Sequence, residues 1–222
     1  MNTESIIAID GPSGVGKGTV AQYLCEQTGF HLLDSGAIYR SLAYGVQLNG
    51  LADENLPGLV ALAENLPVRF EDGKVYYQDQ DISSQIRTET IAAIASKIAT
   101  KPEVRTALLK RQKAFAQPPG LIADGRDMGT VVFPNAPVKL FLTATAEERA
   151  KRRLKQLKNQ DVDVNIREIT QDIKERDKRD RTRTTSPLLP AADALTIDTT
   201  HLSIEQVCEL AMNAIREKEL IE

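Results

Sequence analysis

Short runs of apolar, often β-branched residues alternate along the chain with longer segments that are apolar on one face only. The first run, residues 6–9, breaks into a glycine-rich stretch and resumes as an amphipathic helical pattern over residues 19–28. Further runs predict buried strands at 31–34, 120–124, 138–142 and 194–198. Strands that alternate with helices are typical of a parallel sheet with both faces covered by helices.

Helix signals agree with this alternation. The pattern predicts a second helix over residues 37–47. Two capping-box pairs, Thr145 with Glu148 and Ser203 with Gln206, predict the starts of two further helices. In the last helix one apolar stripe predicts packing on the sheet; it consists of Ile204, Val207, Cys208, Ala211 and Ile215.

Two segments interrupt the alternation. Residues 67–71 and 73–77 predict a β-hairpin that turns at Asp72–Gly73, inside an insert of about 49–116. The segment after Arg149 has much charge and few apolar residues, which favours a mobile lid of about 148–166, with a solvated helix hairpin as the alternative. We expect a single domain over 1–222, with a core made of 1–48, 117–147 and 167–222.

The glycine-rich stretch after the first strand has the pattern of a phosphate-binding loop, or P-loop. It reads GPSGVGKGT and consists of Gly11, Pro12, Ser13, Gly14, Val15, Gly16, Lys17, Gly18 and Thr19. Between a strand and a helix, such glycines let backbone N–H groups surround an anion at the positive end of the helix. Lys17 can then reach the outer phosphates. The hydroxyl of Thr19 comes one position late, which weakens its assignment as a direct magnesium ligand.

Charge is spread unevenly over the 222 residues. The net charge is −3, but residues 147–183 carry thirteen Lys or Arg against nine Asp or Glu, a local charge of +4. A local basic segment in an acidic chain favours a small polyanionic ligand over a nucleic-acid surface. Cys25 and Cys208 fall in helical patterns and are expected to be reduced core residues. The start of the chain has no signal-peptide pattern and no apolar run could span a membrane, so we expect a soluble, cytoplasmic protein.

Charged side chains follow several predicted strands. Asp10, Asp34 and Asp124 lie at strand ends, where ligands bind in open α/β sheets, although any one of them could be a helix cap or a turn residue. Arg40 and Arg126 follow the second and third strands closely and could each hold a phosphate in a bidentate manner.

A second arginine group lies near the end of the charged segment. Arg176, Asp180 and Arg183 are spaced so that they share one helix face. They could form a surface ion-pair ladder, but Arg179 and Arg181 raise the charge beyond what a ladder needs. Phosphate groups would neutralise such a cluster.

The chain lacks the usual residues of other chemistries. His31 and His201 are its only histidines, and neither has metal or triad spacing; no activated nucleophile is evident. Phosphoryl transfer to a phosphate needs no strong base, since the acceptor oxygen is already ionised near neutrality. It needs positioning and positive charge, which a P-loop lysine, magnesium and arginines supply.

Six segments give the chain a specific resemblance. They are IDGPSGVGKGT (9–19), LLDSGAIYR (32–40), GLIADGRDMGTVVFP (120–134), IKERDKRDRTR (173–183), PAADAL (190–195) and LSIEQV (202–207). In these segments the chain resembles the bacterial cytidylate kinase family, within the P-loop nucleoside monophosphate kinases. The resemblance implies a doubly wound, five-stranded α/β P-loop fold with a monophosphate-binding insert that contains a small antiparallel sheet, and a short lid. It also implies transfer of the γ-phosphoryl group of ATP to CMP or dCMP, in pyrimidine nucleotide metabolism.

The resemblance also implies roles for individual residues. Gly11 to Thr19 would hold ATP, and Lys17, Arg126, Arg176 and Arg183 would be catalytic. The acceptor would be bound by Ser35, Tyr39, Arg40, Ser96, Arg105, Arg126, Asp127, Arg176, Asp180 and Arg183. Ser96, Arg105 and Asp127 among these would read the cytosine edge, whose amino group suits a carboxylate. The resemblance is weakest in the lid, at Arg149, Arg152 and Arg153.

The remaining expectations concern the ligands and partners of the protein and the alternative functions. We expect ATP with Mg²⁺ and CMP or dCMP as the ligands, no protein metal site, no nucleic acid, no membrane and a monomeric chain. One alternative is a P-loop kinase for another acceptor, such as UMP, AMP or a small alcohol. A second is a nucleotide-binding switch ATPase, although the chain lacks the Asn-Lys-x-Asp motif that reads guanine.

Overall fold

The computed structural model of the chain describes residues 5–71, 73–158 and 165–220. The chain divides into two compact units. The sheet unit comprises residues 1–33 and 115–222, and the helical unit comprises residues 34–114.

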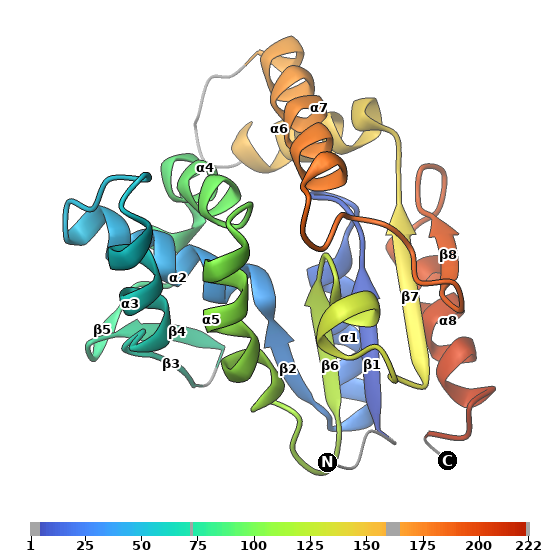
Figure 1. Cartoon of the computed structure of the whole chain (residues 1–222). Helices are drawn as coiled ribbons and strands as arrows, with labels where there is room; N and C mark the ends of the chain where they lie inside the picture. Colours follow the sequence, from blue (N-terminus) through green and yellow to red (C-terminus); the bar gives the residue numbers. More distant parts are fainter. Residues whose placement is uncertain (1–4, 72, 159–164, 221–222) are drawn as a thin grey trace. The chain divides into compact units, whose positions relative to one another are not determined.

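A five-stranded sheet runs through the described residues of the sheet unit, in the order β2–β6–β1–β7–β8 (Figure 1). The strands are β1 (Ile6–Asp10), β2 (His31–Asp34), β6 (Leu121–Gly125), β7 (Val138–Thr143) and β8 (Leu195–Asp198). The central strand β1 pairs in parallel with β6 on one side and β7 on the other, and β7 pairs in parallel with β8. The strand order reverses at β1, so the carboxyl end of β1 is where this kind of sheet binds ligands. The predicted five-stranded α/β fold is confirmed.

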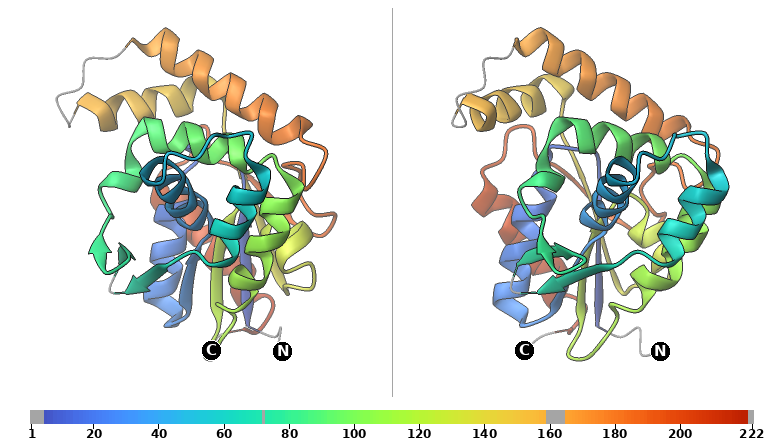
Figure 2. Two further views of the ribbon diagram at one scale, coloured as in Figure 1. Left: turned by 60° about the vertical axis from the view of Figure 1, so that its left-hand side comes forward. Right: turned by 90° about the vertical axis from the view of Figure 1, so that its left-hand side faces the viewer.

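Helices α1 (Lys17–Thr28) and α8 (Ile204–Arg216) lie side by side against one face of this sheet (Figures 1 and 2). Val20 and Leu24 of α1 and Ala211 and Ile215 of α8 are fully buried in one core with the apolar strand residues. This continuous apolar layer fixes the start of α1 relative to the end of β1.

The last helix begins as the sequence predicts. Ser203 caps α8, with its side chain and that of Gln206 forming a reciprocal capping box. One member of the predicted apolar stripe does not reach the core. Ile204 is 37 % exposed, because it lies in the first turn of α8, next to the glycine loop at Gly16 and not over the strands.

The charged segment forms a helix pair. Helices α6 (Ala146–Lys158) and α7 (Ile166–Thr182) run side by side in the views of Figures 1 and 2. Their contact is a small apolar cluster with Ala150, Leu157 and Ile169 buried. Within the described residues, the predicted lid of about 148–166 covers most of α6 and the start of α7, and residues 159–164 of that lid lie outside the described residues.

The helical unit has its own core. Its elements are α2 (Ser35–Leu48), α3 (Leu56–Glu64), β3 (Val68–Glu71), β4 (Lys74–Tyr77), β5 (Gln80–Asp81), η1 (Gln85–Arg87), α4 (Glu89–Ile98) and α5 (Pro102–Lys113). Strands β3, β4 and β5 form an antiparallel sheet, which confirms the predicted hairpin; Asp72 in its turn lies outside the described residues. Helix α2 packs on this sheet through Gly45, where an added Cβ would stand 2.6 Å from Tyr77 Oη.

Gly11 is the glycine on which the turn after β1 most depends. Its φ is +148°, and an added Cβ would stand only 2.2 Å from the Leu142 carbonyl oxygen of β7. We expect Gly11→Ala to lower the free energy of unfolding by at least about 2 kcal/mol, measured by urea denaturation. Gly50→Ala is the matched control: Gly50 also has a positive φ, of +60°, but nothing lies within 4 Å of the added Cβ. Equal losses for the two variants would contradict the steric argument.

Candidate phosphate-binding site

The loop between β1 and α1 has the backbone of an anion cradle. Gly14 (φ +80°) and Gly16 (φ +96°) adopt left-handed conformations, and Gly16 is the N-cap residue of α1. These turns direct the chain so that the first N–H groups of α1, which have no acceptor within the helix, open onto the loop.

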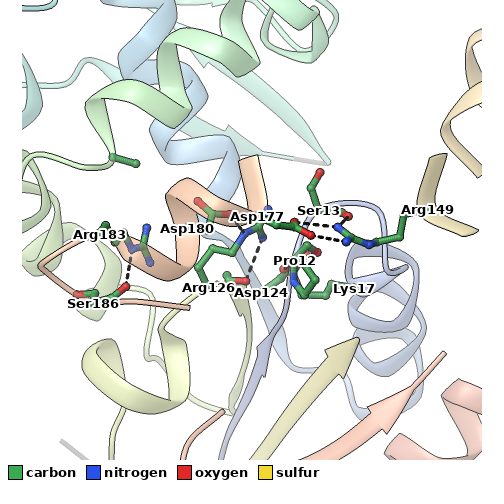
Figure 3. Close-up of polar contacts among 12 residues, drawn as sticks. Pro12, Ser13, Lys17, Asp124, Arg126, Arg149, Asp177, Asp180, Arg183 and Ser186 are labelled. Carbon is green, nitrogen blue, oxygen red and sulfur yellow. Dashed lines mark hydrogen bonds and ion pairs between the residues drawn. The ribbon is translucent and has the colours of Figure 1, made fainter. Parts of the chain in front are cut away.

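Two carbonyls of the loop are held by side chains from elsewhere in the sheet unit. The Ser13 carbonyl oxygen accepts a hydrogen bond from Arg149 Nη1 at 3.1 Å, and the Val15 carbonyl oxygen accepts one from Thr199 Oγ1 at 3.3 Å (Figure 3 shows the first). Arg149 is itself buried and forms a bidentate ion pair with Asp177 of α7. These carbonyls therefore face protein donors, which is the orientation that suits a loop whose N–H groups bind an anion.

Lys17 lies at the first position of α1, and its side chain is turned back into the loop. Its ammonium donates to the Pro12 carbonyl oxygen at 3.1 Å and lies 3.7 Å from Asp124 Oδ1 (Figure 3). Burial first, and then the nearby charges of Arg126 and Arg176, lower the pKa of Lys17 to about 8, against Asp124 and Asp10, which raise it. Lys17 is thus a partly desolvated cation beside other cations.

The predicted arginines of the sheet unit are brought together around Asp180. Arg126 Nε donates to Asp180 Oδ2 at 3.1 Å, and Arg126 Nη1 donates to the Gly125 carbonyl oxygen (Figure 3). Burial would raise the pKa of Asp180, but the charges of Arg126, Arg176 and Arg183 hold that pKa below its usual value. Asp180 is only 8 % exposed. The group is therefore a largely buried cluster that includes Arg126, the residue directly after β6, and is not a surface ladder along α7.

The strand-end carboxylates have three different environments. Asp34 Oδ1 accepts from the backbone N–H of Ala37 and caps α2. Asp124 faces Lys17. Asp10 accepts from backbone N–H groups of the short helix η2 (Met128–Val132). Within this group only Asp124 is paired with the loop lysine.

Three of the predicted residues make described contacts inside the helical unit. The Arg105 guanidinium lies over the Tyr39 ring, 5.6 Å from its centroid, and Ser35 Oγ donates to Gln112 Oε1 at 2.8 Å. Both arrangements are formed by α2 and α5.

Ser96 and Arg40 complete the predicted residues of the helical unit. Ser96 Oγ is buried and has no hydrogen-bond partner within the described residues, which suits a hydroxyl that awaits a ligand. Arg40 is half-buried, and its side chain does not join the contacts described for Ser35, Tyr39 and Arg105.

Sequence reasoning missed several polar contacts. It did not find the Arg149–Asp177 pair or the Gln112 partner of Ser35, and it gave Asp10 no partner. An i, i+4 search does not reveal these pairs, because their members lie 28, 77 and 118 residues apart. The apolar spacing of α5, which buries Gln112 beside Leu108, was the only local signal for one of them.

The fold and this loop define a P-loop nucleotide-binding protein. Residues 7–217 match the protein family described as "Cytidylate kinase", and the chain belongs to that family. The chain is 55 % identical to a cytidylate kinase of Klebsiella pneumoniae (strain 342), over 96 % of each chain. It is 55 % identical to one of Colwellia psychrerythraea (91 % of this chain, 92 % of the relative) and 52 % identical to one of Shewanella halifaxensis (96 % and 95 %). The resemblance seen in the sequence is thus confirmed. No helix among the described residues is both long and apolar enough to cross a bilayer.

The lowered pKa of Lys17 predicts a pH dependence of ATP binding. Because Lys17 is cationic only below its pKa of about 8, the dissociation constant of ATP is expected to rise as pH increases above that value, approaching tenfold per pH unit. Calorimetric titration from pH 6.5 to 9.5 at constant ionic strength measures it. Lys17→Arg is the control, because its guanidinium does not titrate in this range. A rise of equal size in Lys17→Arg would assign the effect to another group.

Proposed function

We propose that this protein is a (d)CMP kinase that transfers the γ-phosphoryl group of ATP to CMP or dCMP, giving ADP and CDP or dCDP. Membership of the cytidylate kinase family supports it. The structural observation that carries the proposal is the electrostatic coupling of the loop lysine to the arginine cluster: Arg126 and Arg176 lie close enough to Lys17 to lower its pKa. A loop that binds the donor phosphates, with arginines that can bind the acceptor phosphate, suits transfer of a phosphoryl group from one to the other.

In the sheet unit we assign the donor to residues 11–19 and the transferred group to Lys17. Arg126, Arg176 and Arg183 would stabilise the charge of the phosphoryl group in flight and of the acceptor phosphate, because a loose transition state spreads charge over the equatorial oxygens. Asp180 would keep these guanidinium groups in place and contact the acceptor ribose. The acceptor phosphate is already ionised, so no residue is assigned as a strong base.

In the helical unit we assign Ser35, Tyr39 and Arg40 to the acceptor phosphate, and Ser96 and Arg105 to the cytosine base. The ring of Tyr39 under Arg105 holds the guanidinium in one orientation, which supports a role in reading a base edge. In the sheet unit, Asp127 would accept from the cytosine amino group. Uracil has a carbonyl at that position, so it would leave a buried acceptor without a donor, at a cost of roughly 1–3 kcal/mol.

Mg²⁺ would come with ATP. No group of three or more His, Cys, Asp or Glu among the described residues is placed to hold a metal alone, whereas an ion carried by phosphates needs only one or two protein ligands. Thr19 lines a hollow of about 540 Å³ between α1 and α8, together with Tyr23 and Cys208, so it suits a ligand role less well. Asp124 lies at a strand end, 3.7 Å from the loop lysine, and we assign this carboxylate to the ion. The ion would neutralise charge on the outer phosphates of ATP.

Other parts of the proposal rest on the family alone. They are a lid over about 148–166, an insert over about 49–116 for the monophosphate, a single-domain monomer and a cytoplasmic location.

An acceptor panel tests the reaction. With ATP and magnesium, ADP release is expected to be fast with CMP and dCMP and slow with UMP, AMP and GMP. Lys17→Ala should reduce turnover at least about a hundredfold, because it removes a charge that acts on the transferred group. Lys218→Ala removes one exposed lysine and serves as the control. ADP release without any monophosphate would favour a switch ATPase, and release with another acceptor would favour a different P-loop kinase.

Asp127→Ala tests the reading of the base. The ratio of kcat/KM for CMP over UMP is expected to fall by about one to two decades, chiefly through the loss of CMP turnover. The rate with saturating CMP is expected to change less than KM, because Asp127 is assigned to binding and not to the transferred phosphoryl group. An unchanged ratio in a folded variant would remove Asp127 from this role.

A further inference from the structure

Asp10 is a buried carboxylate that the proposed reaction leaves without a role. It is the last residue of β1, directly before the phosphate loop, and only 5 % exposed. Asp10 Oδ1 accepts from the backbone N–H of Met128 and Oδ2 from that of Gly129, both at 2.8 Å. Both oxygens therefore bind the first turn of η2, from a strand 118 residues earlier in the chain.

This contact replaces the usual cap of a helix. The first N–H groups of a helix have no acceptor within it, and an Asp just before the helix commonly caps them with its own side chain. Asp127 stands at that position of η2, but its side chain makes no capping hydrogen bond; its backbone carbonyl oxygen accepts from Val131 and Val132. Because Asp10 satisfies the N–H groups of Met128 and Gly129, the Asp127 carboxylate is not used to cap its own helix.

The arrangement is costly for stability. Burial, with a smaller contribution from the charge of Asp127, raises the pKa of Asp10 to about 6, against the two backbone N–H groups and Lys17, which lower it. A second buried carboxylate close by makes ionisation of Asp10 less favourable. Departures of this kind from what stability favours concentrate at functional sites.

We propose that Asp10 is a positioning residue for recognition of the acceptor base: by capping η2 from the neighbouring strand, it holds Asp127 in the orientation that contacts the base. The inference rests on the proposed function, in which Asp127 reads cytosine. It adds a residue that acts through another and touches no substrate. Since β1 also leads into the phosphate loop, the same carboxylate fixes the base-reading residue relative to the donor site within the sheet unit.

Asp10→Asn tests this positioning role. The amide is close in size but has only one acceptor oxygen for two N–H groups. We expect kcat/KM for CMP to fall about tenfold because KM rises. The ratio of kcat/KM for CMP over UMP should fall toward the value for Asp127→Ala. The Kd of ATP should stay within about threefold of the wild-type value. Asp79→Asn is the charge control: Asp79 is 94 % exposed and has a positive φ of 64°, which Asn tolerates.

Gly129→Ala perturbs the same contact from the other side. Its added Cβ would lie 3.4 Å from Asp10 Oδ2 and 3.2 Å from the Lys139 side chain, so the helix start must shift slightly. If both residues act through one contact, the double variant loses no more CMP selectivity than the more affected single variant. Additive losses in the double variant would contradict a shared contact.

The outcomes separate the two proposals. Two results for a folded Asp10→Asn variant would overturn the positioning role and leave the reaction intact. One is a wild-type KM for CMP with a wild-type ratio of kcat/KM for CMP over UMP. The other is an equal loss of affinity for CMP, UMP and ATP. A wild-type protein that does not prefer CMP overturns the proposed function and this inference with it. If Asp10→Asn does not fold, Gly129→Ala decides: a retained ratio overturns the inference and a lowered ratio supports it.

Discussion

The buried positive charge at the carboxyl end of the sheet is the constraint on which the rest of the site depends. Lys17 has lost much of its hydration, and this burial, together with the nearby charges of Arg126 and Arg176, lowers its pKa to about 8. Asp124 and Asp180 offset part of this charge. Such an arrangement is unfavourable without a polyanion, and it becomes favourable when phosphates replace the lost water. The arrangement of charges in the site is therefore more favourable with phosphates bound than without them.

The fold holds this charge in place from outside the phosphate loop. Arg149 joins the Ser13 carbonyl of the loop to Asp177 of α7, one residue from Arg176. Arg149 of α6 thus links the loop, through a hydrogen bond, and α7, through a buried ion pair. A buried pair of this kind is weak evidence for stability but good evidence that a geometry must be kept, because removing one partner leaves an uncompensated charge.

The sequence predicted the strands well and the polar contacts poorly, for physical reasons. Apolar β-branched runs such as residues 6–9 must be buried, so all five strands of the main sheet were found, with their ends misplaced by no more than one residue. The P-loop motif singled out Lys17, whereas Arg126 was singled out by the rule that strand ends face one rim. That rule could not distinguish the environments of Asp10, Asp34 and Asp124, because a partner such as the backbone of η2 depends on packing and not on spacing. In the charged segment, many oppositely charged residues could pair with Arg149, so charge alone does not select Asp177. The assigned roles of the site residues remain predictions.

The mixture of one lysine with several arginines has a consequence for binding. Arginine stays charged throughout the accessible pH range, so Arg126 and Arg176 depress the pKa of Lys17 at any pH at which the protein is folded. A bound phosphate has the opposite effect and favours the ammonium form. By linkage, two effects have the same free energy: phosphate binding raises the pKa of Lys17, and protonation of Lys17 strengthens phosphate binding. The lysine is therefore the one cation of this cluster whose charge responds to the ligand, and the arginines that surround it make that response larger.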